Sequence, residues 1–283
     1  MNVWVEAARP RTLSAAVAPV LVGTAASGRF IPSRFAATMT VAVAIQAGVN
    51  YANDYFDAAA GVDSPARVGP RRAVSSGLVS PLAMKIAMAS AFLVAAVAGL
   101  FLALAIGPEL IALGALCVAA ALGYSGGPRP YASEGLGEVF VFVFFGLVAT
   151  VGSSYAQAEQ VLAPAVAAAV PVGFLATAIL VVNNLRDLVS DAAAGKRTLA
   201  VRWGSEKTRS LYRALIVSSF LLAVVVVAAA GSAWPLVCLL ALPLGAAVIG
   251  AVASEQNLVP ALGATARLQV AYAGLLSVGL WIS

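Results

Sequence analysis

The chain contains a succession of apolar segments, each about as long as a lipid bilayer is thick. A helix of roughly 20 apolar residues crosses the hydrocarbon core, and it satisfies all of its backbone polar groups internally. Of the 283 residues, 61% are hydrophobic and only 10% are charged, which excludes an ordinary soluble protein. The sequence therefore predicts an all-α, polytopic membrane bundle that forms a single transmembrane domain over residues 1–283.

About nine transmembrane helices are expected. The run VFVFVFF at 139–145 alternates as a strand does, but it lies inside an apolar segment of spanning length, which favours a helix. The predicted spans are residues 13–28, 35–56, 82–106, 110–126, 136–157, 164–182, 211–230, 233–253 and 262–282.

The basic residues lie almost entirely on one side of these predicted spans. Among the 17 Lys and Arg residues, only Arg29 and Arg34 fall on the side opposite to the N-terminus. Because cytoplasmic segments are rich in Lys and Arg, we expect a multi-pass protein of the plasma membrane with a cytoplasmic N-terminus. The same bias accounts for the net charge of +5 without a nucleic-acid partner.

All five aspartates gather in two short segments. NYANDYFDAAAGVDS begins at residue 50, and NNLRDLVSDAAAGKRT begins at residue 183. The two segments contain Asp54, Asp57 and Asp63, and Asp187 and Asp191, respectively. Each lies where a predicted span ends and a long cytoplasmic connection begins, residues 57–81 and residues 183–210.

Helical periodicity aligns the polar side chains within each segment. Asn50, Asp54 and Asp57 fall on one face of a helix, with Asn53 beside them. The second segment repeats this pattern, because Asn183, Asp187 and Asp191 follow one another at intervals of four residues. We therefore expect two columns of oxygen ligands that face a shared cavity and contain the active site.

The residues that follow each column are basic, and together they indicate the ligand. Neighbouring carboxylates repel one another unless a cation lies between them. Mg²⁺ takes a few protein carboxylates and completes its shell with phosphate oxygens, while Arg and Lys neutralise the remaining charge. Since this pocket lies where helices enter the lipid, the sequence predicts a diphosphate with a long apolar tail, a polyprenyl diphosphate. The chain has no His, which excludes a histidine base.

Three other interpretations of the aspartates remain open. Solvated helix ends do not explain why all five gather in two segments. A proton or ion relay in a membrane transporter does not explain the basic residues. A CDP-alcohol phosphotransferase has its four Asp in one contiguous segment, whereas 130 residues separate Asp57 from Asp187 here.

The strings NDYFD and DLVSD resemble the two Asp-rich motifs of the UbiA superfamily of intramembrane prenyltransferases. The longer strings ARPRTL, RVGPRR, GLGEVFVFVFFG and NNLRDLVSDAAAGKRTLAVRWG are similar to its menaquinone branch. The likeness extends from residue 4 to about residue 204. It implies a central cavity that is capped by the two long connections and opens sideways to membrane lipid.

The resemblance also implies ligands for two Mg²⁺ ions. The first motif, N-D-x-x-D-x-x-x-D, is matched by Asn53, Asp54 and Asp57, but Gly61 occupies its last position and Asp63 follows two residues later. The second motif, D-x-x-x-D, is matched in full. The expected metal ligands are Asn53, Asp57, Asp63, Asp187 and Asp191.

Further roles follow from the same resemblance. Arg67, Lys196 and Arg197 are expected to bind the diphosphate. Tyr124 matches a tyrosine of the family. The candidates to stabilise an allylic cation are the aromatic side chains of Tyr51, Tyr55, Phe56 and Tyr124. Arg129 and Arg9 are expected to bind the carboxylate of the acceptor, and Asp54 to orient its hydroxyl group.

The implied reaction transfers a polyprenyl group to 1,4-dihydroxy-2-naphthoate, with loss of CO₂ and diphosphate, to give demethylmenaquinone. Other branches of the superfamily use a different acceptor, such as 4-hydroxybenzoate, chlorophyllide or haem. The quoted strings favour the naphthoate.

Overall fold

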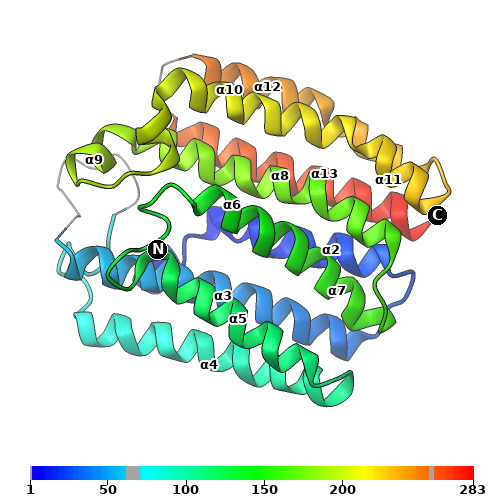
Figure 1. Cartoon of the computed structure of the whole chain (residues 1–283), viewed down its shortest axis with the longest axis horizontal. Coiled ribbons are helices and arrows are strands. Elements are labelled where there is room, and N and C mark those ends of the chain that lie inside the picture. The colour runs from blue at the N-terminus through cyan, green and yellow to red at the C-terminus, as the bar shows by residue number, and fades with distance from the viewer. Residues whose placement is uncertain (1, 62–70, 255–257) are drawn as a thin grey trace.

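The computed structural model describes residues 2–61, 71–254 and 258–283, and within these ranges every regular element is a helix (Figure 1). The elements are α1 (Val3–Ala7), η1 (Pro10–Thr12), α2 (Ser14–Ala26), α3 (Pro32–Ala59), α4 (Pro81–Ala105), α5 (Glu109–Ser125), α6 (Gly137–Val141), η2 (Phe142–Val148), α7 (Ala149–Ala158), α8 (Ala163–Arg186), α9 (Leu188–Ala193), α10 (Leu199–Leu221), α11 (Ala223–Ala230), η3 (Trp234–Ala241), α12 (Leu242–Ala253) and α13 (Val259–Trp281).

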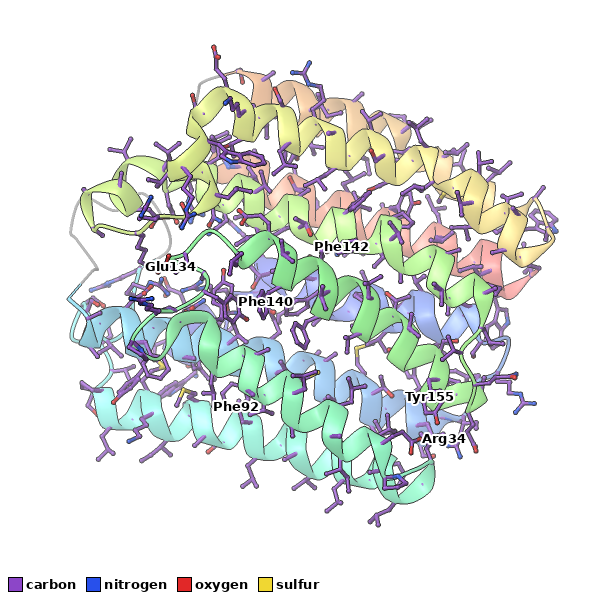
Figure 2. All side chains as sticks on the ribbon, viewed as in Figure 1. Arg34, Phe92, Glu134, Phe140, Phe142 and Tyr155 are labelled. Carbon is purple, nitrogen blue, oxygen red and sulfur yellow. The ribbon has the colours of Figure 1, made fainter. Side chains whose placement is uncertain are left out.

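The long helices run side by side along one direction of the molecule. Figure 1 shows α10 and α12 at one edge, α4 at the opposite edge, and α8 and α13 between them. The short helix α9 projects at one end of the bundle, and the C-terminus lies at the other end. Arg34 and Tyr155 are labelled at the end away from α9 in Figure 2, whereas Glu134 lies near α9.

Each predicted span falls on one helix or on consecutive helices. The apolar run 136–157, for example, is helical over its length, with a π-helical turn at Phe142–Val148. Six helical stretches are long and apolar enough to cross a membrane, and α2 and α5 are shorter apolar helices. The number of crossings, nine, stays a prediction. Large apolar side chains such as Leu93 and Leu104 of α4 point outward, as a lipid surface requires.

The main core surrounds α8. Val172, Leu175 and Val182 of this helix are buried against Ile216 of α10 and Leu268 of α13. A smaller cluster joins α3, α4 and α5 on the other side of the bundle. The bundle therefore has two packed halves, and α2, α6, η2 and α7 line the space between them.

Two glycines bring the π-helical segment close to α8. A Cβ atom on Gly146 would lie 2.6 Å from the Cα of Gly173, and a Cβ on Gly173 would lie 2.9 Å from the Cα of Gly146. Real side chains do not tolerate such distances, so the approach requires glycine at both positions.

The two connections differ from the expected loops. Helix α3 continues to Ala59, so Asp57 lies within the helix. Residues 183–210, expected as one loop, contain the end of α8, all of α9 and the first half of α10. A turn at Gly204, with φ 77°, interrupts α10 and redirects the chain into the bundle.

Candidate active site

The polar residues of the first segment share one face of α3. Asn50, Asn53, Asp54 and Asp57 are all buried, while the exposed residues of this helix lie elsewhere. The predicted alignment along one helical face is therefore confirmed. Helix α3 is continuous and has Pro32 at its first position, where the missing N–H costs nothing.

Asp54 binds the backbone of the connection that follows α3. Its Oδ2 accepts a hydrogen bond from the N–H of Ala73, and its Oδ1 accepts one from the N–H of Val74, both at 2.9 Å. These bonds engage both carboxylate oxygens. In this geometry Asp54 holds the loop, and its expected role toward the acceptor hydroxyl stays a prediction.

Asp57 connects the two acidic segments. Arg72 donates from Nη2 to Asp57 Oδ2 at 2.6 Å, and Lys196 donates from Nζ to Oδ1 at 3.0 Å. Lys196 lies 139 positions after Asp57. This contact brings the ends of α3 and α9 to one place, as the shared cavity predicted from the sequence requires.

The second segment contains a break that the sequence pattern did not indicate. Helix α8 ends at Arg186, Asp187 adopts φ −92° and ψ 5°, and α9 begins at Leu188. Asn183, Asp187 and Asp191 therefore do not form one stripe of a continuous helix. Backbone angles of this kind are sparsely populated and common in active sites.

Asp187 is buried and paired with the residue before it. Arg186 donates from Nε and Nη2 to the two carboxylate oxygens at 2.8 and 2.6 Å. The same Nη2 donates to Asn183 Oδ1 at 2.9 Å. Such a bidentate pair fixes the carboxylate at the end of α8.

The residues after α9 form a tight turn. The N–H of Lys196 binds the carbonyl of Asp191 at 2.9 Å, and the N–H of Arg197 binds the carbonyl of Ser133 at 2.9 Å. The side chain of Arg197 is exposed. The turn thus directs Lys196 toward Asp57 and fastens α9 to the 126–136 loop.

A cavity of about 250 Å³ lies beneath these charged groups. Its polar lining includes Arg9, Asn50, Asn53 and Asn183, and most of the remaining lining is apolar or aromatic. A space with a polar end beneath charged residues and an apolar remainder suits an amphiphile with an anionic head.

A row of aromatic rings forms one wall of the cavity. Tyr124 meets Tyr131 edge to face at 5.5 Å, Tyr131 stacks on Phe140 at 3.9 Å, and Phe144 follows at 6.0 Å from Phe140. In Figure 2, the label of Phe140 lies between the ribbons of α6 and α3. The phenol of Tyr131 donates to the carbonyl of Ala120, and burial raises its pKa.

Other expected aromatic residues lie away from this wall. Tyr51 and Tyr55 pack with Ala73, Val79 and Met84, and Tyr51 donates to the carbonyl of Trp4. Helix α3 presents these rings on a different face from Asn50 and Asn53. Within the described residues, only Tyr124 among the four sequence candidates lines the cavity.

Three predicted ligand-binding residues have other placements. Arg129 is exposed and is not part of the lining that the described residues form. Residues 127–129 are all exposed, so the assigned role in acceptor binding has no support in this geometry. Arg67 and Asp63 lie outside the described residues. Arg9, by contrast, lines the cavity.

The site also contains residues that sequence reasoning missed. Arg72 and Arg186 pair with the aspartates, and Gln46, Tyr131 and Phe140 line the cavity. Arg186 adjoins Asp187 in sequence, which was an available signal. Gln46 lies one helical turn before Asn50 on α3, which was a second signal. Arg72, Tyr131 and Phe140 depend on contacts between separate elements, which no local pattern reveals.

The donor atoms fit a hard divalent cation. Carboxylate and amide oxygens of Asn53, Asp57, Asp187 and Asp191 are the ligand types that Mg²⁺ prefers. Among the described residues, no three Cys, Asp or Glu side chains form a ready-made metal group. Arg72 and Lys196 neutralise the carboxylate of Asp57, and Arg186 neutralises that of Asp187. Few carboxylates with basic residues beside them are what we expect of a site in which phosphate oxygens of the ligand complete the coordination shell of the metal.

Comparison with known proteins shows what the whole chain is similar to. Residues 16–278 match the model of the UbiA prenyltransferase family. The chain is 44% identical to the 1,4-dihydroxy-2-naphthoate octaprenyltransferase of Mycobacterium tuberculosis, covering 95% of this chain and 94% of that protein. It is 38% identical to the enzyme of the same name from Escherichia coli, covering 85% and 82% of the two chains.

Solved structures show the same fold. The apo structure of a UbiA homolog from Aeropyrum pernix aligns with a TM-score of 0.73 at 15% identity, over 95% of this chain and 97% of that chain. A UbiA homolog from Archaeoglobus fulgidus, bound to GPP and Mg²⁺, aligns with a TM-score of 0.60 at 17% identity, over 97% and 99%.

Proposed function

The chain belongs to the UbiA prenyltransferase family, and from this premise we propose that it transfers a polyprenyl group from polyprenyl diphosphate to 1,4-dihydroxy-2-naphthoate. The observation that carries the proposal is the meeting of both acidic segments above an apolar cavity, through the contact of Lys196 with Asp57. Relatives at 36–44% identity bear the name of this activity.

The diphosphate of the donor binds among the basic residues. Arg72 and Lys196 now bind Asp57, and Arg186 binds Asp187. An incoming diphosphate offers these cations stronger oxygen partners, and the carboxylates then become available to metal. Arg67 and Arg197 belong to the same basic group of the sequence and complete the proposed donor site.

The metal ligands of the proposal are Asn53, Asp57, Asp187 and Asp191, with two Mg²⁺ ions as the expected number and Asp63 as a further candidate. A UbiA homolog bound to GPP and Mg²⁺ supports the use of a divalent ion. When bound, the metal supplies positive charge to the leaving diphosphate. Arg72 and Lys196 act on the same oxygens.

The chemistry is an electrophilic aromatic substitution. The bond between the prenyl C1 and the diphosphate oxygen breaks, and its electron pair leaves with the diphosphate. The aromatic faces of Tyr124, Tyr131 and Phe140 stabilise the allylic cation and exclude water. The ring carbon that bears the carboxylate forms the new bond, and CO₂ departs. No electrons are removed, so the product is the quinol form of demethylmenaquinone.

The proposed location is the plasma membrane, with the N-terminus and the site on the cytoplasmic side. The multi-pass character rests on six helices of spanning length. The orientation rests on the distribution of Lys and Arg, because Arg29 and Arg34 alone lie on the opposite side.

A transfer assay tests the proposal. Purified protein would be incubated with Mg²⁺, a radiolabelled prenyl diphosphate and a panel of acceptors that includes the naphthoate and 4-hydroxybenzoate. We expect lipid-soluble product and CO₂ with the naphthoate. Product only with another acceptor would assign a different branch of the family, and binding without turnover of any acceptor would refute the enzyme.

A further inference from the structure

Two amide side chains of α3 line the cavity, and neither belongs to the proposed metal or diphosphate site. Gln46 and Asn50 are one helical turn apart, and their exposed fractions are 7% and 3%. Both precede Asn53 on α3, so they lie farther along this helix from Asp57 and the charged end. Buried amides on a cavity wall indicate a ligand when one of their polar atoms lacks a protein partner.

A hydrogen-bond network fixes the orientation of both amides. Asn50 Nδ2 donates to the carbonyl of Ala8 at 2.8 Å and to Thr12 Oγ1 at 3.2 Å. Gln46 Nε2 donates to the same Thr12 oxygen at 3.1 Å. The Thr12 hydroxyl gives its own proton to the carbonyl of Arg9 at 3.0 Å. Since Ala8 and Thr12 offer only lone pairs to the amides, each amide must present its NH₂ group there.

The carbonyl oxygens of the two amides consequently face the other way. Within the described part of the chain, neither Gln46 Oε1 nor Asn50 Oδ1 receives a hydrogen bond, and neither is an enclosed atom without solvent access. Both residues belong to the cavity lining. The wall therefore offers two hydrogen-bond acceptors, and a ligand there must bring donors.

Arg9 adds a cation to the same wall. Its backbone has φ 52° and ψ 72°, the left-handed region that residues other than glycine rarely adopt. This turn joins α1 to η1, brings the Arg9 carbonyl to Thr12, and leaves the residue on the lining. Arg9 and the two amide residues thus belong to one lining.

We propose that Gln46 and Asn50 accept hydrogen bonds from the ring hydroxyl groups of the aromatic acceptor, while Arg9 binds its carboxylate. The inference rests on the proposed function and identifies the acceptor class as a hydroxylated aromatic acid. A prenyl diphosphate has no hydroxyl donors, so this wall distinguishes acceptor from donor. An amide oxygen does not take up the proton, so the pair orients the phenol and leaves it protonated.

The test compares binding of two ligands to two variants. The ligands are 1,4-dihydroxy-2-naphthoate under anaerobic conditions and 2-naphthoate, which keeps the carboxylate and lacks both hydroxyls. The variants are Gln46→Leu and the control Gln269→Leu, which removes an amide that is also buried, on α13, but outside the cavity lining. The affinity of each variant for each ligand is measured by calorimetry in the absence of the donor. The KM values for acceptor and donor are measured in the transfer assay.

We expect Gln46→Leu to weaken binding of the dihydroxynaphthoate about fivefold, the effect of one lost hydrogen bond. Binding of 2-naphthoate and the donor KM should stay unchanged, and Gln269→Leu should alter neither ligand. Thr12→Val, which removes the anchor of both amides, should reproduce the effect if Gln46→Leu does not fold.

Equal weakening of both naphthoates by Gln46→Leu, or no change in either, would overturn the inference. If the wild-type enzyme is active and Gln46→Leu binds both naphthoates as the wild type does, only the inference is wrong and the proposed function stands. Wild-type protein that transfers no prenyl group to any hydroxylated naphthoate would remove the proposed function itself.

Discussion

Asp54 and Asp57 lie three residues apart on α3, yet their carboxylates have different partners. Asp54 accepts two backbone N–H groups of the connection, and Asp57 accepts Arg72 and Lys196. Because Ala73 directly follows Arg72, the hold of Asp54 on the backbone determines where Arg72 lies. We therefore regard Asp54 as a positioning residue that acts through Arg72.

Asp54→Asn is expected to lower turnover at least about tenfold while the helices stay folded. Asparagine places an NH₂ group against one of two backbone N–H donors, and a hydrogen bond to a charged group contributes roughly 1.5–3 kcal/mol. Hydrogen exchange at the Ala73 and Val74 amides should accelerate in this variant.

The matched control is Asp57→Asn, which should also lose activity but leave exchange at these amides slow. Unchanged exchange in Asp54→Asn would show that the loop does not depend on this carboxylate, and the positioning role would be wrong.

Turnover is expected to depend on divalent metal. Three of the four proposed ligands are carboxylates, and replacing Asp57 or Asp187 with Asn removes one negative charge from the site. Excess EDTA should abolish product, and Mg²⁺ should restore it. Asp57→Asn and Asp187→Asn should each retain a few per cent of the rate at most, with unchanged circular dichroism. Full activity in EDTA would exclude the metal.

Most helices were predictable because hydropathy and span length leave few choices for an apolar chain of this length. The buried polar face of α3 was predictable, because side chains of a helix return to the same face with a period of 3.6 residues. The break at Asp187 was not, because no Gly or Pro accompanies it and the angles of one residue depend on Arg186 and Asn183. Nor could spacing reveal that Tyr131 and Phe140 stack, since separate elements bring them together.

The contact of η2 with α8 depends on Gly146 and Gly173, and it positions the cavity wall that carries Phe144. Gly146→Val places a branched side chain against the Cα of Gly173. Overpacking of this kind costs about 1–3 kcal/mol, so we expect a lower thermal unfolding temperature in detergent.

Gly250→Val is the control, because a Cβ there meets no atom within 4 Å. It should unfold close to the wild-type temperature. If the two variants unfold alike, the helices have room to separate and the close approach does not limit stability.

The arrangement of the whole bundle separates charge from apolar space. The four aspartates that the structure describes lie with their basic partners at the end near α9, and the cavity extends from there between the two packed halves. Under the proposed function, the head of the donor stays at the charged end and its tail runs along the apolar lining. Residues far from the chemistry should then select the length of the tail.

Gly114 of α5 and Gly152 of α7 permit a direct test of this arrangement. Both line the cavity, and a Cβ on either would meet no atom within 4 Å. Gly114→Leu and Gly152→Leu should therefore fold and fill part of the cavity, whereas Gly250→Leu adds the same side chain outside it.

We expect the KM of an eight-unit prenyl donor to rise about tenfold or more in the two cavity variants, because forcing the tail past the new side chain costs about 1–3 kcal/mol. The KM of a one-unit donor should change less than about twofold, since removing the length of the tail removes the collision. Equal effects on both donors would mean that the tail leaves the site by a different route.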